Sequence, residues 1–522
     1  MIERRRAGAR SRPLRAFAVA FALCFAAMAL WSLATPLFGA PDEPVHVEKA
    51  AAVVRGELVG RLVGGASNPL AVVTVPAFYA EIRNEPTCFH THPKVPASCA
   101  SLPAPSAKPE PVLIYTARYP PLYYALVGLP SLLGEGRLEL YLMRLVSAAL
   151  ASAFVALAFA CAAASSRSRL LVPALVVALT PMVLFLGGVV NPSSFEIAAA
   201  LCAWTSGALL VLERHEAPPR ALVAAFAVSA CAFELARAIS PFWLALEGLV
   251  LVALAERRAL RSLLTDARVH VALGAIVCCG IVAVAWTVRE HATDVFSRVS
   301  VPAGVPELTI LERSFAHNAF YVPDMVGIFG WFDTHPPLAT FVLWYAMVGA
   351  LLVGGALAAT RRQLAVLASF VLAVLVVPVA ISSSQAHAVG YVWQGRDTLP
   401  FAVGLPVVAA SLVARRLAGA ADVVCARATA VLAVLAVLAQ LAAFFEALRR
   451  YAVGVAGPDF AFLLHAPWQP PAGSLALVVA EAVVLVLAGA AAVAAARAPA
   501  AGEGARLAAS PLLERAGAGA AR

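Results

Sequence analysis

Twelve stretches of about 20 largely apolar residues recur along this chain, and they limit its fold more than any other feature. A helix of that length crosses the hydrocarbon core of a bilayer. Only 13% of the 522 residues are charged, against roughly a quarter in a soluble domain, which excludes a water-soluble globule. The sequence therefore predicts an all-α integral membrane protein. The predicted spans are 14–34, 138–163, 169–189, 194–212, 220–238, 241–256, 269–288, 337–358, 364–383, 398–414, 427–446 and 474–496.

Arginines in the short connections between these spans predict the orientation. They are Arg167, Arg169, Arg214, Arg220, Arg257, Arg258, Arg261, Arg268, Arg361, Arg362, Arg415, Arg416 and Arg427. Short basic loops stay in the cytoplasm, so we expect both termini on the cytoplasmic side of a bacterial inner membrane. This orientation requires the apolar stretch Tyr119–Leu133 to lie along the membrane surface. As a thirteenth span, that stretch would invert everything after it.

The predicted organisation has three parts. Residues 1–13 form a basic cytoplasmic N-terminus, residues 14–496 the membrane domain, and residues 497–522 an Ala/Gly-rich, disordered cytoplasmic tail. Residues 36–137 form a large first outer loop, in which we expect surface helices. The net charge of +9 follows from the arginines of the cytoplasmic side, so it does not indicate a nucleic-acid partner. Any reaction would take place at the outer membrane face.

Asp42, Glu43 and His46 follow the first predicted span within the box Pro41-Asp42-Glu43-Pro44-Val45-His46. Two adjacent carboxylates and a histidine near a helix start can supply a general base for an acceptor hydroxyl, or can share a divalent cation. The alternative is structural, because aspartate before proline is ordinary N-terminal helix punctuation. Both interpretations remain open for Asp42.

Three further motifs follow this box along the chain. They are Arg118-Tyr119-Pro120-Pro121-Leu122-Tyr123-Tyr124, Asn191-Pro192-Ser193-Ser194 and Gly395-Arg396-Asp397. With these motifs, the chain resembles an uncharacterised (domain-of-unknown-function) family of bacterial multi-pass membrane proteins. That family is similar in layout to the GT-C superfamily of polyprenyl-phosphate-sugar glycosyltransferases. The resemblance covers roughly residues 14–450. One departure is Asp397, where an aromatic residue is expected.

The resemblance implies a membrane glycosyltransferase. An acidic residue of the first outer loop, Asp42 or Glu43, would be the catalytic base, and Arg396 and Arg237 would hold the lipid phosphate. The implied partners are a polyprenyl-phosphate-linked sugar donor, a cell-envelope glycan or lipid acceptor, and membrane lipids. His46 would contact substrate. A cofactor stays unknown, with a divalent cation as one option.

Two alternatives to an enzyme remain. A transporter or flippase of a lipid-linked precursor predicts paired broken helices and repeated halves, neither of which the sequence shows. A non-catalytic membrane scaffold would make Asp42 and Arg396 replaceable. The long, asymmetric first outer loop favours an enzyme.

Glu234, Arg237 and Glu247 are ionisable residues in or beside predicted spans. Glu234 and Arg237 stand three apart on one helix face, and Glu247 follows the next turn. We therefore expect the three side chains to meet between antiparallel helices. Such groups are costly in a membrane unless they are paired, so they mark either a functional interior or a structural ion-pair cluster.

Two other acidic residues are candidates for substrate binding. Glu196 is spaced from Ser193 as in a capping box, but it can also add a carboxylate to the outer cavity. Asp333 lies with His335 in Trp331-Phe332-Asp333-Thr334-His335, a segment typical of an interfacial aromatic belt.

Cys88 and Cys99 are the two cysteines well inside the first outer loop. In an oxidising compartment a disulfide between them is favoured. The alternative is a zinc site completed by His90 and His92.

Overall fold

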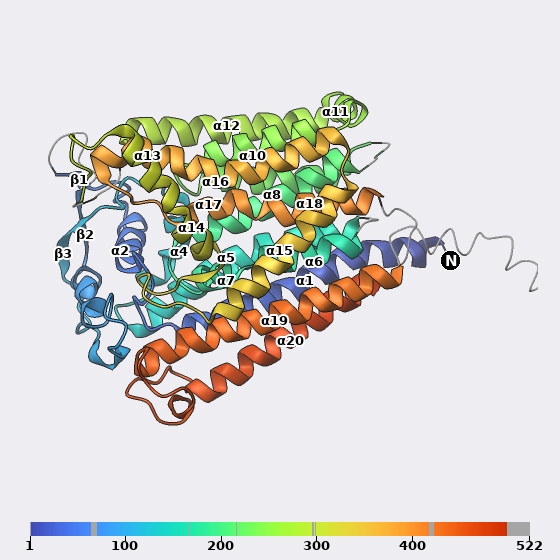
Figure 1. Ribbon diagram of the computed structural model, residues 1–522. Helices are drawn as coiled ribbons and strands as arrows, with labels where there is room; N and C mark the ends of the chain where they lie inside the picture. The colour runs from blue at the N-terminus through green and yellow to red at the C-terminus, as the bar shows by residue number, and fades with distance from the viewer. Residues whose placement is uncertain are drawn as a thin grey trace, which may run out of the picture.

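In the computed structural model the chain forms a bundle of long helices with irregular structure gathered at one end (Figure 1). The structure describes residues 2–63, 70–165, 168–213, 215, 217–294, 297, 299–416 and 422–497. Arg167, Arg214 and the predicted tail from residue 498 onward lie outside the described residues. The predicted class, an all-α integral membrane protein, is confirmed.

Nine helical segments within the described residues are long and apolar enough to cross a membrane. They belong to α1 (Ile2–Ala34), α5 (Arg137–Ala164), α8 (Pro192–Leu212), α12 (Ala267–Glu290), α15 (Leu338–Ala358), α16 (Arg361–Val389), α17 with α18 (Gly395–Ala402 and Gly404–Arg416), α19 (Asp422–Val453) and α20 (Ser474–Arg497). The bent pair α6 (Ser168–Ala178) and α7 (Pro181–Gly187) raises the number to ten if it is one span. The predicted twelve would also need α9 (Arg220–Glu234) and α10 (Ser240–Leu254). These helices have 15 residues each, so the count of twelve stays a prediction.

Proline explains the break between α6 and α7, whose axes differ by 66°. Pro181 lacks the N–H that a continuous helix would use, and its ring clashes with the preceding turn. Thr180 begins the new helix by accepting a hydrogen bond from Val183 N at its side-chain oxygen. The second half, α7, leads toward the candidate site described below.

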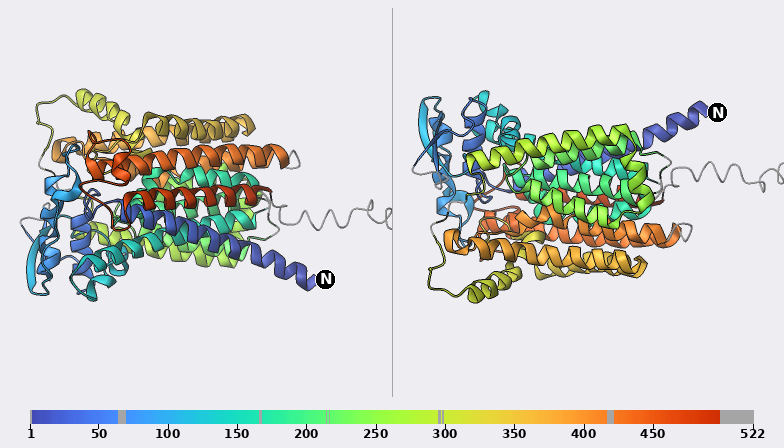
Figure 2. Two further views of the ribbon diagram at one scale, coloured as in Figure 1. Left: turned by 90° about the horizontal axis from the view of Figure 1, so that it is seen from below. Right: turned by 90° about the horizontal axis from the view of Figure 1, so that it is seen from above.

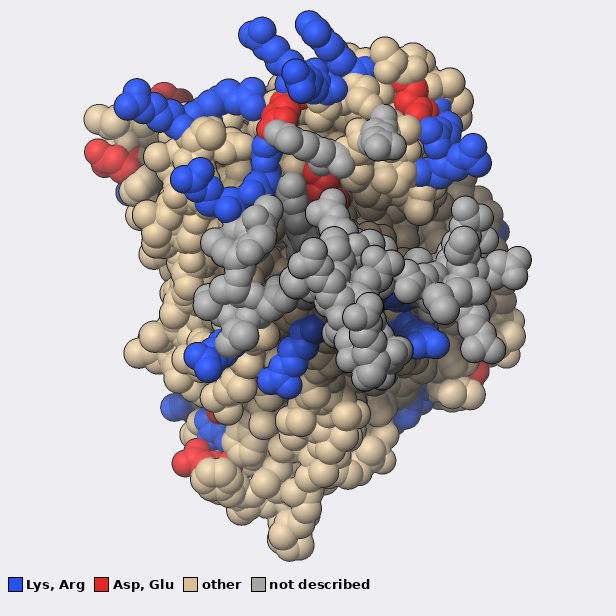
Figure 3. Space-filling model, turned by 90° about the vertical axis from the view of Figure 1, so that its right-hand side faces the viewer, with Lys and Arg blue, Asp and Glu red and all other residues tan. Residues whose placement is uncertain are grey.

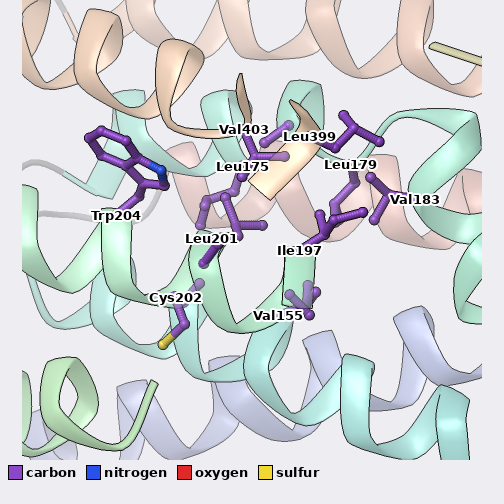
Figure 4. Packing of buried hydrophobic residues seen from close by; sticks show 14 of the residues in the cluster. Val155, Leu175, Leu179, Val183, Ile197, Leu201, Cys202, Trp204, Leu399 and Val403 are labelled. Atoms are coloured by element: carbon purple, nitrogen blue, oxygen red, sulfur yellow. The ribbon is translucent and has the colours of Figure 1, made fainter. Parts of the chain in front are cut away.

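Helix α8 is the centre of the bundle, because every residue from Pro192 to Leu212 is buried. It contacts α5, α9, α17 and α18, and branched aliphatic side chains of α5, α6 and α17 pack around it (Figure 4). Trp204 of α8 stacks on Phe370 with ring centroids 4.9 Å apart. Gly404 approaches that indole so closely that a Cβ atom would lie 2.3 Å from it, so a glycine is needed there.

The described parts of residues 36–136 and of the connections after α12, α16 and α19 meet at one end of the bundle, which we call the loop end (Figures 1 and 2). It contains α2 (Glu43–Val53) and a sheet of order β1-β2-β3, made of β1 (Arg61–Leu62), β2 (Ala71–Pro76) and β3 (Pro109–Ile114). Both strand pairs are antiparallel, with Val73 opposite Val112. The sequence predicts the surface helices here but not the sheet. The shorter helices are α3 (Ala77–Glu81), η1 (Ile82–Cys88), η2 (Ala97–Cys99), α4 (Leu122–Val127), η3 (Leu129–Leu132), α13 (Glu307–Ala316), α14 (Asn318–Gly327) and η4 (Ala461–Leu463).

The stretch Tyr119–Leu133 stays at the loop end, as its predicted surface position requires. Its helix α4 has 6 residues, which is about 9 Å and too short to cross a bilayer. Tyr123 and Tyr124 are buried, whereas Leu132 and Leu133 are exposed.

Arginines collect at the opposite end, which we call the arginine end. Arg362 donates to the carbonyls of Leu254 and Ala255, and Arg415 pairs with Glu256, so three inter-helix connections meet there. The amphipathic helix α11 (Arg257–Leu264) lies at the same end. Figure 3 views this end and shows blue Lys and Arg side chains predominating over red acidic ones.

Candidate functional site

Asp42 stands immediately before α2 and directs its carboxylate away from that helix. Its backbone is left-handed, with φ 63°, and its side chain makes no capping hydrogen bond. The carboxylate instead accepts from Tyr115 Oη at 2.7 Å and from Arg396 Nη2 at 2.5 Å. The alternative interpretation of Asp42 as a side-chain helix cap is therefore wrong.

Tight backbone contacts place both partners of Asp42. Tyr115 follows strand β3, and the next residue, Thr116, donates its hydroxyl to the Val45 carbonyl of α2. Arg396 stands in the first turn of α17, after Gly395. A Cβ atom on Gly395 would lie 2.4 Å from the Tyr321 carbonyl, so only glycine permits this approach.

Asp42 and Arg396 line a small polar pocket of about 20 Å³, room for roughly one water molecule. The wall comes from the first loop, the start of α8, the α9–α10 turn and the start of α17. The lining residues are Asp42, His46, Tyr115, Thr116, Tyr119, Asn191, Pro192, Ser193, Arg237 and Arg396. Four predicted site residues therefore share one pocket with Tyr119 and with residues of the Asn191–Ser194 motif; the four are Asp42, His46, Arg237 and Arg396.

Among the described residues, one terminal nitrogen of the Arg396 guanidinium has a hydrogen-bond partner and the other has none. Its residue exposure is 8%, and Nη2 binds Asp42. Its Nη1 is buried and has no hydrogen-bond partner among the described residues. A buried guanidinium nitrogen without a partner can donate a hydrogen bond to an added ligand oxygen or water.

Arg237 pairs with two carboxylates, and neither belongs to Glu234 or Glu247, the partners expected from the sequence. Its Nη1 lies 2.8 Å from Asp397 Oδ1 and 3.2 Å from Glu196 Oε2. Asp397 also accepts from Gln394 N through Oδ2 at 3.1 Å. Asp397, the departure from the family pattern, therefore pairs with Arg237 and caps α17, and it leaves Arg396 to Asp42.

The expected meeting of Glu234, Arg237 and Glu247 is wrong. Arg237 lies in the turn after α9 and points to α8 and α17. Neither carboxylate oxygen of Glu247, nor Oε2 of Glu234, has a hydrogen-bond partner among the described residues. Glu234 instead packs beside Gly280 of α12. Spacing along one helix pair could not show that α8 and α17 offer closer carboxylates.

Glu196 is not part of a capping box. Asn191 caps α8 instead, because its Oδ1 accepts from Ser193 N at 3.0 Å. Glu196 is fully buried and accepts from Ser240 Oγ at 2.7 Å as well as from Arg237. It lies behind the pocket wall, so in this structure it positions Arg237 instead of contacting substrate.

Glu43 requires a correction. Its Oε1 accepts from Arg144 Nε and Val190 N, and its Oε2 accepts from Arg144 Nη2 and Phe38 N. Arg144 also donates to three carbonyls at the end of α1. Both side chains are 1% exposed, and Glu43 does not line the pocket. In this structure Glu43 thus joins α2 to α1 and α5 through Arg144, and its carboxylate does not face the pocket that holds Asp42.

His46 lines the pocket from the first turns of α2. Its Nδ1 lies 2.9 Å from Tyr124 Oη, and its ring stacks on the same tyrosine. Burial, with added repulsion from Arg396 and Arg237 and opposed by Asp42, lowers the pKa of His46 to about 3. His46 is therefore neutral at physiological pH.

The charge state of Asp42 follows from its neighbours. Burial alone would raise the pKa of its carboxyl group. The Arg396 guanidinium and the hydrogen bond from Tyr115 more than offset burial, so the net pKa is lowered. Asp42 is ionised, as a general base must be before it takes a proton.

Asp333, a candidate for substrate binding, lies outside the polar pocket and lines a second cavity at the loop end. Its Oδ2 pairs with Arg450 Nη2 at 2.7 Å, and its Oδ1 accepts from the Thr334 hydroxyl. Arg450 is fully buried. The carboxylate is thus committed to a structural ion pair.

Cys88 and Cys99 form a disulfide in the structure, so these thiolates are not free for the zinc alternative. The shared cation of Asp42 and Glu43 also lacks a second ligand, because Glu43 is committed to Arg144. Within the described ranges, no group of three or more His, Cys, Asp or Glu side chains converges.

Sequence reasoning missed Tyr115 and Asp324. Tyr115 is the hydroxyl donor to Asp42, and its only signal is its position just before Arg118–Tyr124. Asp324 is fully buried on α14 and accepts from Gly395 N at 2.7 Å, which fixes the start of α17 beside Arg396. Burial raises the pKa of Asp324 to about 7, against the opposing effect of Arg396. No sequence pattern pairs residues 324 and 395.

Comparison with known proteins identifies one family. The family described as "Predicted membrane protein (DUF2142)" matches residues 25–405, which confirms the resemblance carried by the motifs. No curated protein matches the chain in sequence.

Two solved structures are similar to this chain. ArnT from Cupriavidus metallidurans in the apo state has a TM-score of 0.36 at 16% identity, covering 86% of this chain and 75% of that chain. The same protein bound to undecaprenyl phosphate has a TM-score of 0.34, with the same identity and coverage. At this level of similarity they carry no conclusion about the chemistry of this chain.

Proposed function

The chain belongs to the DUF2142 family of membrane proteins, and we propose that it is a glycosyltransferase that takes a sugar from a polyprenyl-phosphate donor. The proposed acceptor is a hydroxyl of a cell-envelope glycan or lipid. The observation that carries the proposal is the ion pair between Asp42 and Arg396, in a pocket at the loop end.

The two residues have complementary chemical capacities. An ionised carboxylate can remove the proton of an acceptor hydroxyl. A guanidinium with an unpaired nitrogen can donate to phosphate oxygens, and its planar fork suits them geometrically. Arg237, in the same pocket, adds a second positive group.

The proposed reaction is a single displacement. The acceptor hydroxyl loses its proton to Asp42, and its oxygen forms a bond to the anomeric carbon of the donor sugar. The bond between that carbon and the phosphate oxygen breaks, and its electron pair leaves with the polyprenyl phosphate. Arg396 and Arg237 stabilise the charge that develops on the leaving phosphate.

In the proposed reaction the pocket widens to admit the donor sugar. A volume of about 20 Å³ is too small for a sugar. Donor phosphate would compete with Asp42 for Arg396, and a guanidinium that turns to phosphate releases the carboxylate. The base would thus become available when the donor is bound.

The transporter alternative is less well supported. It predicts discontinuous helices in both halves of the chain. Among the described residues, α6–α7 is the one helix pair that is long and apolar enough to span a membrane together and is bent by more than 40° at a short break. A scaffold, in turn, would not need a buried, unpaired Arg396 nitrogen.

The test uses the full chain reconstituted in nanodiscs of bacterial phospholipid. Radiolabelled polyprenyl-phosphate-linked hexose and pentose donors are supplied with an envelope fraction, and released polyprenyl phosphate is measured. We expect release with at least one donor, and none with Asp42→Asn. Donor translocation without release would support the transporter. No release with any donor would contradict the proposed activity.

A further inference from the structure

A second cavity at the loop end lies outside the polar pocket. Its volume is about 630 Å³, within the usual range for small-ligand sites. Three segments enclose it: the loop closed by the Cys88–Cys99 disulfide, the hairpin Phe329–Thr334, and the end of α19. We call it the aromatic groove, because Trp331 and Phe332 line it with partly exposed rings.

Arg450 joins the three walls of the aromatic groove. Its guanidinium donates to the carbonyls of Phe89, His92 and Val95 in the disulfide loop and pairs with Asp333 of the hairpin. The chain after α19 adds a hydrogen bond from Val455 N to the Pro93 carbonyl at 2.8 Å. The walls are therefore fixed before any ligand arrives, which lowers the entropic cost of binding.

Strained backbone occurs at two residues that line the groove. Thr91 has φ 59° and Phe332 has φ 63°, although both carry side chains. Such left-handed conformations cost of order 1–3 kcal/mol and persist where the surrounding structure imposes them, as at ligand-binding clamps. Here they direct the Thr91 and Phe332 segments toward one space.

The ionic groups of the groove are neutralised within the protein. Asp333 pairs with Arg450, and Glu446 receives both Nε and Nη2 of Arg449 at 3.0 and 2.7 Å. A phosphate or a strongly cationic ligand would lack an uncommitted charged partner. The groove suits a neutral ligand.

The remaining surface suits a ligand with both apolar and polar faces. Trp331 and Phe332 contribute partly exposed rings, which also contact His90 and Phe320 respectively. Thr91 offers a hydroxyl and His335 an exposed imidazole. Sugars present C–H faces flanked by hydroxyls, so aromatic rings combined with a few polar groups match them. We propose that the aromatic groove binds a neutral oligosaccharide.

The groove is anchored to the segment that carries Asp42. Trp331 Nε1 donates to the Phe38 carbonyl, and Tyr451 Oη donates to the Gly39 carbonyl at 2.9 Å. Phe38 stands four residues before Asp42, a chain distance of at most about 14 Å. An oligosaccharide held on Trp331 therefore lies within reach of the polar pocket.

This proximity identifies the bound sugar chain as the acceptor. That identification rests on the proposed transferase function, whereas oligosaccharide binding itself does not. The groove would hold the growing end of an envelope glycan and direct one hydroxyl toward Asp42.

Binding is measured by saturation-transfer NMR and calorimetry on the full chain carrying Asp42→Asn, so that no turnover occurs. The probes are chitotetraose, mannotetraose, a galactan tetrasaccharide and an arabinan tetrasaccharide. We expect at least one probe to bind. Phe332→Ala should raise the Kd of that probe at least tenfold. Trp331→Phe keeps an aromatic ring but loses the hydrogen bond to the Phe38 carbonyl, and it should raise the Kd by a smaller factor.

Phe315→Ala is the matched control, because Phe315 is 62% exposed on α13 and does not line the groove. It should leave the Kd unchanged. Failure of all four probes to bind would overturn the proposal, as would equal weakening by Phe315→Ala and Phe332→Ala. Sugar binding combined with no release of polyprenyl phosphate by the wild-type chain, whichever donor is supplied, would remove the acceptor role but keep the sugar site.

Discussion

Arg396 Nη2 lies 2.5 Å from Asp42 Oδ2, although 354 positions separate the two residues in sequence. The pair joins the first loop to the start of α17 and closes the polar pocket. It lowers the pKa of the Asp42 carboxyl and leaves Arg396 Nη1 without a hydrogen-bond partner among the described residues. In the proposed reaction this single contact keeps the base ionised and idle until a phosphate draws the guanidinium away.

Arg396→Lys should weaken donor use. Lysine offers a point charge without the planar fork, so one charge-assisted hydrogen bond to phosphate is lost, about 1.5–3 kcal/mol. The expected result is a donor KM raised roughly tenfold to a hundredfold, with a nearly unchanged acceptor KM. Arg237→Lys should act in the same direction. The matched control is Arg289→Lys, whose side chain is 86% exposed. Unchanged donor KM in both pocket variants would return these arginines to structural roles.

Glu43→Gln should destabilise the protein. The substitution leaves the buried Arg144 guanidinium without its countercharge, which costs about 3–5 kcal/mol. Thermal unfolding in detergent should show a lower Tm and lower yield. Glu307→Gln, at a side chain that is 81% exposed, is the control. A stable Glu43→Gln variant without activity would instead restore Glu43 as a candidate catalytic group.

His46→Phe should reduce the loss of folding stability that occurs as the pH falls below about 6.5. The pKa of His46 is about 3 in the folded protein and about 6.5 when unfolded, so only the unfolded chain takes up its proton between these values. The stability contributed by neutral His46 is complete above pH 6.5 and is lost as pH falls below it. Between pH 7.5 and 5 the wild type should lose roughly 1–2 kcal/mol more than His46→Phe. Parallel Tm profiles would show that His46 titrates normally.

The loop end should face the outside of the bacterial inner membrane. Arginines at the other end, and a disulfide in the loop, are both typical of that orientation. Reporter fusions after Pro103 and after Arg258 should therefore give opposite signals, periplasmic for Pro103 and cytoplasmic for Arg258. Equal signals from the two fusions would mean that the order of spans is wrong.

The sequence predicts the membrane class because span length and apolar composition are local properties. It also predicts that Asp42, Arg396 and Arg237 belong to one site, because motif order along the chain indicates a family. The three residues do line one pocket. The sequence does not predict the role of Tyr115, because its hydrogen bond to Asp42 depends on where strand β3 ends.

Incorrect expectations arise where a distant partner outcompetes a local one. The sequence places Glu43 beside Asp42, but in the structure its carboxylate pairs with Arg144, 101 positions away. The spacing predicts an ion pair between Arg237 and Glu234, but in the structure Arg237 pairs with Glu196 of α8 and Asp397 of α17. Local spacing cannot rank such competitors, since tertiary packing decides which buried charges meet.

The most direct test of the central claim is the single-turnover rate of sugar transfer by Asp42→Asn with donor bound. Asparagine is nearly isosteric, and its one side-chain oxygen can accept from Arg396 while its NH2 group donates to the Tyr115 hydroxyl, so the fold and donor binding should be retained. Loss of a general base predicts a rate lower by roughly 10²–10⁴-fold. Asp459→Asn, at a side chain that is 78% exposed, should transfer normally. A rate for Asp42→Asn within twofold of the wild type would contradict the assignment of Asp42 as the base.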